Sequence, residues 1–111
     1  MTVTVKVLIP AKYAENSQTT QYTATGVTAI IDKFTATNIS SSAATISVNL
    51  VTAAGTSGNN NLITKTKTLQ PSEVYTFPEL VGQVLGVGDF ISTIAGTASA
   101  INIRASGREV T

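Results

Sequence analysis

The most constraining feature of this 111-residue sequence is a series of short runs in which apolar side chains alternate with threonine, serine or lysine. The clearest run places Ile46, Val48 and Leu50 on one face of a strand and polar residues on the other. Turn-forming residues separate the runs, as in Ser40–Ser42. We therefore predict short strands over residues 2–9, 19–25, 27–38, 45–50, 62–69, 74–77, 90–95 and 100–105.

This spacing of seven or eight short strands favours an all-β fold. We expect an antiparallel β-sandwich that is jelly-roll-like or, as the alternative, immunoglobulin-like. One short helix is expected over Glu79–Leu85, because Pro78 followed by an acidic residue suits the start of a helix. The apolar stripe of this helix would comprise Leu80, Val81, Val84 and Leu85.

The length of the chain predicts a single domain over residues 1–111. The polar segment after Pro10 and the polar end of the sequence lie outside the clearest strands. We therefore expect an extended N-terminal arm over residues 1–18 and a C-terminal tail over residues 106–111.

The composition excludes several kinds of chemistry. The sequence contains no cysteine and no histidine, so the usual ligands of zinc and iron and the usual base of a serine nucleophile are absent. The six acidic residues lie in different predicted elements, which gives no obvious carboxylate pair for glycoside hydrolysis. We therefore expect no enzymatic activity, no metal and no cofactor.

The charge of the chain bears on its partners. Charged residues make up 12% of the sequence, the net charge is +1, and the basic residues are scattered. This pattern argues against nucleic acid or a membrane as a partner. The first residues lack the basic and apolar regions of a signal peptide, so we expect synthesis in the cytoplasm. Nineteen threonines and ten serines give a weakly charged surface that tolerates close packing against neighbours.

An acid and a base, Asp32 and Lys33, lie side by side inside one of the most apolar runs of the sequence. Strict alternation along a strand would turn one of these charges toward the core. A β-bulge here would instead let Ile31 and Phe34 both point inward while the charges stay in water. The alternative is that Asp32 is partly buried and paired, either with an arginine such as Arg104 or with a neighbouring subunit.

Two lysines, Lys65 and Lys67, lie two residues apart on one predicted strand. Lysines in this arrangement commonly protect an exposed edge strand against aggregation. Contact with an acidic surface of a partner is the alternative. Arg104 and Arg108 form the other basic feature, and neither pair is accompanied by the aromatic residues that a nucleic-acid site would need.

Four stretches of the sequence resemble small structural proteins of tailed bacteriophages and prophages. They are "IPAKYAENSQTTQYTA", "AIIDKFTATN", "ELVGQVLGVGDFIS" and the terminal "IRASGREVT". The resemblance covers nearly the whole chain, and the closest functional group is the accessory head proteins, which are called decoration, cement or staple proteins. It implies a virion protein on the capsid exterior, assembled in the host cytoplasm, that clamps neighbouring subunits of the major capsid protein. It also implies a homo-oligomer, a dimer or a trimer, without catalytic residues.

Under this hypothesis we expect contacts to come from the two ends of the chain, from charged strand residues and from the loop over residues 53–61. An arm that adds an edge strand to a neighbour is the expected mode of contact. The candidate interface residues are Val3, Val5, Val7, Lys12, Tyr13, Asp32, Lys65, Lys67, Arg104, Arg108 and Glu109. The alternatives are a head–tail connector or tail component, and a carbohydrate-binding or host-adhesion module.

Overall fold

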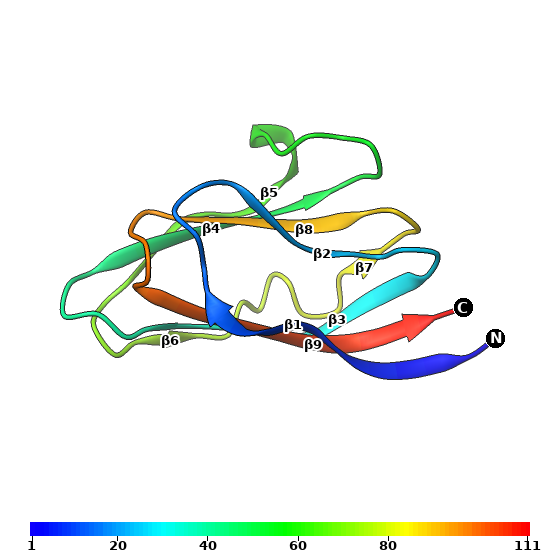
Figure 1. Ribbon diagram of the computed structural model, residues 1–111, viewed down its shortest axis with the longest axis horizontal. Coiled ribbons are helices and arrows are strands. Elements are labelled where there is room, and N and C mark those ends of the chain that lie inside the picture. Colours follow the sequence, from blue (N-terminus) through cyan, green and yellow to red (C-terminus); the bar gives the residue numbers. More distant parts are fainter.

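The computed structural model describes residues 1–111 and confirms an antiparallel β-sandwich, in which two sheets face each other across one core (Figure 1). The first sheet consists of β1 (Val3–Tyr13), β3 (Thr28–Asn38), β6 (Val74–Tyr75), β7 (Val84–Leu85) and β9 (Ile101–Val110). The second sheet consists of β2 (Thr19–Thr23), β4 (Ala44–Val51), β5 (Leu62–Leu69) and β8 (Phe90–Ala95). The helical content is one 3-10 turn, η1 (Asn59–Asn61).

The strand order is that of a jelly roll. The first sheet has the order β1-β9-β3-β6, with β7 also paired to β3, and the second has the order β2-β8-β4-β5. The chain changes sheet between β1 and β2, again before β3 and again before β4. In an immunoglobulin-like sandwich the first two strands share a sheet, so the immunoglobulin alternative is wrong.

The core lies between the sheets and contains 22 buried apolar residues. Its aromatic centre is formed by Phe34 of β3 and Phe77 of the loop after β6, whose ring centroids are 4.7 Å apart in an edge-on arrangement. Tyr75 continues this cluster, with its ring 4.6 Å from that of Phe77. Residues from both sheets surround the rings, and this burial supplies the main driving force for closing the sandwich.

The helix expected over Glu79–Leu85 is not formed. Leu80 and Leu85 are buried as expected, but Val81 and Val84 point to solvent, and Gly82 has a left-handed φ of 87°. The segment instead forms turns and ends in β7, which pairs with β3. A helix of one or two turns is costly to nucleate, whereas pairing with β3 satisfies backbone groups along an otherwise open strand.

Residues 3–13 of the expected arm and residues 106–110 of the expected tail belong to strands of the first sheet. β1 runs through Pro10, which is possible because β1 lies at the edge of the sheet, where a missing N–H costs no hydrogen bond to a neighbour. β9 includes residues 106–110 and lies between β1 and β3. The prediction missed this part of β9 because its sequence is polar, although β9 is a central strand that pairs on both sides.

The β-bulge is confirmed at Asp32. In the pairing of β3 with β9, Ile31 lies opposite Gly107 and Lys33 lies opposite the preceding residue of β9, so Asp32 is the extra residue. Ile31 and Phe34 are both completely buried, whereas the two charged residues between them are exposed. The bulge therefore reconciles two inward apolar side chains with two charges in water.

Gly107 is required where β9 passes the bulge. A Cβ atom at this position would lie 2.0 Å from the carbonyl oxygen of Ile30 and 3.0 Å from Cδ1 of Leu8. The first contact is with backbone and has no flexible end that could move away. Glycine at this point thus lets the bulged strand and β1 both approach β9 closely.

We predict that Gly107→Ala destabilises the protein by about 3 kcal/mol, the upper range of overpacking costs, because the bulged backbone must shift. Urea denaturation measures the change. The matched control is Gly58→Ala, where the added Cβ has its nearest neighbour, Oδ1 of Asn60, at 3.4 Å, and φ is −168°. The control should stay within about 0.5 kcal/mol of wild type. Equal stabilities of the two variants would contradict this account of the bulge.

Candidate functional site

The valines of β1 line the outer face of the first sheet. Glu109 of β9 points toward the second sheet, because its carboxylate accepts a hydrogen bond from the Tyr22 hydroxyl of β2. Thr4 lies opposite Glu109 and therefore shares that inner face. The alternating residues Val3, Val5 and Val7 thus point outward, and Val5 is 84% exposed.

The apolar surface continues across four strands. Val5 lies opposite Arg108 of β9, Arg108 lies opposite Ile30 of β3, and Ile30 lies opposite Val84 of β7. Residues directly opposite each other share a face, so this row crosses the whole outer surface of the sheet. We define the valine face as the outward residues Val3, Val5, Val7, Ile30, Asp32, Val84, Arg108 and Val110.

One ion pair lies within the valine face. Arg108 grips the Asp32 carboxylate with two nitrogens, at 2.9 Å from Nη2 to Oδ1 and 3.0 Å from Nε to Oδ2. The hydrogen bonds from Arg108 lower the pKa of Asp32. The side chains remain 44% and 42% exposed, so the pair contributes little to folding. Asp32 is therefore both bulged and paired with an arginine of another strand, as one interpretation expected, but that arginine is Arg108 and not the suggested Arg104.

A shallow hollow borders the valine face beside the bulge. It is lined by Asp32, Lys33, Thr76, Pro78 and Val81. β6 and β7 pair with opposite ends of β3. The hollow lies between these two short strands, beside the middle of β3. Asp32, Lys33 and the half-exposed Val81 line the hollow together. The surface beside the valine face is therefore concave and not flat.

Glu109, a predicted contact residue, instead joins the sheets. Its carboxylate accepts hydrogen bonds from the Tyr22 hydroxyl at 2.5 Å and from Nζ of Lys6 at 3.3 Å, and its side chain is only 16% exposed. The bond from Tyr22 lowers the pKa of Glu109, while burial and this same bond raise the pKa of Tyr22. This cluster ties β2 of one sheet to β1 and β9 of the other.

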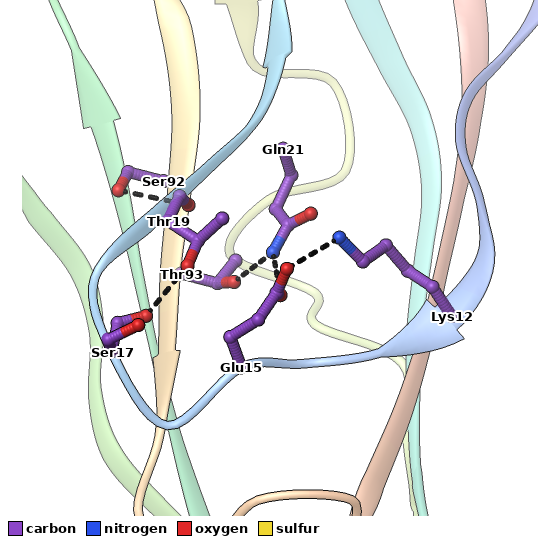
Figure 2. Close-up of polar contacts among 7 residues, drawn as sticks. All are labelled: Lys12, Glu15, Ser17, Thr19, Gln21, Ser92 and Thr93. Atoms are coloured by element: carbon purple, nitrogen blue, oxygen red, sulfur yellow. Dashed lines mark hydrogen bonds and ion pairs between the residues drawn. The ribbon is translucent and has the colours of Figure 1, made fainter.

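Lys12 belongs to a second polar cluster between the sheets (Figure 2). Its Nζ lies 2.9 Å from Oε2 of Glu15, and the other oxygen of Glu15 accepts a hydrogen bond from Gln21. Gln21 also donates to the Thr93 hydroxyl of β8 at 3.0 Å. The bond from Lys12 is the main cause of the lowered pKa of Glu15. This network fastens the turn after β1 to the second sheet.

Lys65 and Lys67 lie on β5, which is an edge strand as predicted. Lys67 Nζ is 4.7 Å from the centre of the Tyr75 ring, and the Tyr75 hydroxyl donates to Glu79 at 2.7 Å. Burial alone would raise the pKa of Glu79, but hydrogen bonds from Thr64 and Tyr75 outweigh it and the net direction is downward. Lys67 is thus engaged within the fold, away from the valine face.

The loop over residues 53–61 is held against the outer side of the second sheet. Asn49 of β4 donates to the carbonyl of Gly58 at 3.0 Å and to Oδ1 of Asn61 at 2.6 Å. Gln18 donates to the Ser92 hydroxyl at 2.7 Å on the same sheet. These bonds make the loop part of the sandwich rather than a free contact arm.

The predicted interface residues thus separate into a first group of seven on the outer side of the first sheet and a second group of four. Val3, Val5, Val7, Asp32 and Arg108 meet on the valine face. Tyr13 and Arg104 share the outer side of the same sheet farther along, since Tyr13 lies opposite Asn102, an outward residue of β9 two positions before Arg104. The second group, Lys12, Lys65, Lys67 and Glu109, lies elsewhere.

Sequence reasoning missed Ile30, Val84 and Val110 as members of the valine face. The apolar spacing predicts Val84 in the buried stripe of a helix, but its side chain is 58% exposed. The signal that unites these residues is the pairing of β3 with β7 and β9, and no single run of the sequence contains it.

Comparisons of the chain with protein-family models, with curated proteins and with solved structures find no match. No group of three or more acidic side chains converges in a way that could hold a metal ion. The structure has no helix with the length and hydropathy needed to cross a membrane.

We predict that Tyr22→Phe lowers stability by about 1–2 kcal/mol at neutral pH, because the mostly buried carboxylate of Glu109 loses one of its two donors. Tyr13→Phe is the control, since Tyr13 is 46% exposed, and it should leave stability unchanged. The pKa of Glu109 is lowered from 4.5, mainly by the hydrogen bond from Tyr22. This bond therefore contributes its full stability above pH 4.5, and the contribution is lost as the pH falls through the lowered pKa. The difference between Tyr22→Phe and wild type should therefore shrink in acid, and a constant difference would contradict the assignment.

Proposed function

We propose that the protein is a non-enzymatic virion protein that binds the exterior of a tailed-phage capsid and clamps neighbouring major capsid subunits. The valine face is the observation that supports this proposal best. Exposed apolar residues that gather over several strands are typical of a surface that another protein covers. The resemblance of the sequence to accessory head proteins supplies the identity of the partner.

The composition of the valine face suits close packing against a large protein surface. Apolar side chains surround a single ion pair, Asp32 with Arg108, whose members already satisfy each other. A partner can therefore cover the face without leaving a buried charge unpaired, which would cost more than burying the ion pair intact. The apolar centre would supply affinity and the ion pair would fix orientation.

On a capsid shell, each single contact can have a lower affinity and the protein still binds firmly. A capsid repeats the same subunit junction many times, so one chain that touches two subunits gains from effective concentration. Modest contacts of this kind, repeated around symmetry axes, would resist expansion of the shell. A small sandwich whose two sheets are linked by two polar clusters is suited to transmit such load between subunits.

Two other functions receive less support. A carbohydrate-binding module usually presents solvent-facing aromatic side chains, and Tyr13 is the only aromatic residue among the large exposed side chains of this protein. A head–tail connector or tail component would use a similar protein-binding face. The number of copies per particle separates these roles, since a capsid clamp covers the shell and a connector occupies one vertex.

The valine face can be tested by adding purified protein back to phage particles that lack it. We predict that Val84→Lys weakens co-sedimentation with particles roughly tenfold or more, because a charge replaces an apolar contact. Val87→Lys is the matched control, since Val87 is 63% exposed in the turn before β8, outside the valine face, and it should bind like wild type. If wild type does not bind, or both variants bind equally, the proposed docking through this face is wrong.

A further inference from the structure

Most edges of the two sheets are protected against pairing with another strand, and one stretch of β1 is not. On the second sheet, β2 has five residues with a register shift, and β5 carries lysines and a positive φ of 48° at Thr66. On the first sheet, the edge beside β3 is broken between the two-residue strands β6 and β7. β1 itself has register shifts after Val7 and Pro10 close behind, so only Val3–Val7 remains regular and open.

The backbone of this stretch presents its free groups at regular intervals. Thr2 and Thr111 exchange two hydrogen bonds, at 3.2 and 3.0 Å. Hydrogen-bonded pairs alternate along antiparallel strands, so Thr4 and Lys6 also bond to β9. The N–H and C=O groups of Val3, Val5 and Val7 therefore point away from β9 and toward the open edge.

We propose that a second copy of this chain pairs with the open edge, strand β1 against strand β1, antiparallel about a two-fold axis at Val5. In this register Val5 lies opposite Val5 of the second copy, and Val3 lies opposite Val7. Each of these residues has its free groups on the open edge, so each pair exchanges two N–H···O=C bonds. The pattern of free groups is complementary to itself, which is the requirement for an isologous dimer.

Charge disfavours the register shifted by one residue toward Lys6. Lys6 lies opposite Thr4 of the second copy, whereas a shift that centres the axis on Lys6 would oppose two lysines, which is destabilising. Thr4 in turn lies opposite Glu109 on the inner face. Lys6 of the second copy therefore enters the same row at two strand spacings, roughly 10 Å, from Glu109, which carries the opposite charge.

The dimer extends the valine face across the two-fold axis. Residues opposite each other share a face, so the six valines of the two β1 stretches form three opposed pairs and one continuous apolar patch on the outer side. This inference goes beyond the proposed function and does not rest on it, because it concerns the edge of β1 and a second copy of the same chain. Experiments on the purified protein alone can test it.

A single-cysteine scan measures the register directly, because the natural sequence has no cysteine. Cα atoms of a hydrogen-bonded antiparallel pair lie about 5.5 Å apart, within the range of a disulfide. Val5→Cys should therefore form a covalent dimer under mild oxidation at least tenfold faster than Val3→Cys or Val7→Cys. In those variants the two cysteines lie roughly 14 Å apart along the strands. Val87→Cys reports the rate of random collision at an exposed site.

Light scattering of the reduced wild-type protein should give the mass of a dimer. Val5→Lys should give a monomer with an unchanged circular dichroism spectrum, because Val5 is exposed and its replacement opposes two charges across the axis. A wild-type monomer or trimer would overturn the proposal. So would cross-linking of Val5→Cys that is no faster than that of Val87→Cys, or faster cross-linking at position 3 or 7.

Discussion

One extra residue in β3 sets the arrangement on which the rest of the first sheet depends. The bulge at Asp32 lets Ile31 and Phe34 both enter the core, although two charged residues separate them. It also brings the Asp32 carboxylate to Arg108 on the neighbouring strand. Gly107 makes the bulge possible, because any side chain there would collide with the backbone of β3. Core packing and the charge at the centre of the valine face thus follow from the same local constraint.

Alternation of apolar and polar residues was sufficient to predict the sandwich and most of its strands, but not β7 or the second half of β9. The sequence also suggested the bulge, as one of two interpretations of "IIDKF", and the structure shows both the bulge and an ion pair of Asp32. The choice between Arg104 and Arg108 as partner of Asp32 depends on strand register, which no local pattern contains. The expected helix failed because its apolar spacing fits two structures, and pairing of Val84 and Leu85 with β3 decides between them.

The candidate site shows the same division between local and long-range information. The valines of β1 are visible in the sequence as an alternating run, and they lie on the surface as contact residues should. Their neighbours Ile30, Val84 and Val110 join them only through pairing between strands. Glu109 and Lys12 looked like free surface charges, yet each belongs to a polar cluster between the sheets. A weakly charged sandwich with one apolar outer face fits a role in binding other proteins better than a role in catalysis.

Electron microscopy of the phage particle tests the central claim most directly, because it shows both where the chain lies and which side faces the capsid. The account predicts density for the sandwich on the outside of the shell. It also predicts that the outer side of β1, β9 and β3 lies against the major capsid protein. Absence of the chain from the capsid exterior, or a bound sandwich whose valine face points to solvent, would contradict it.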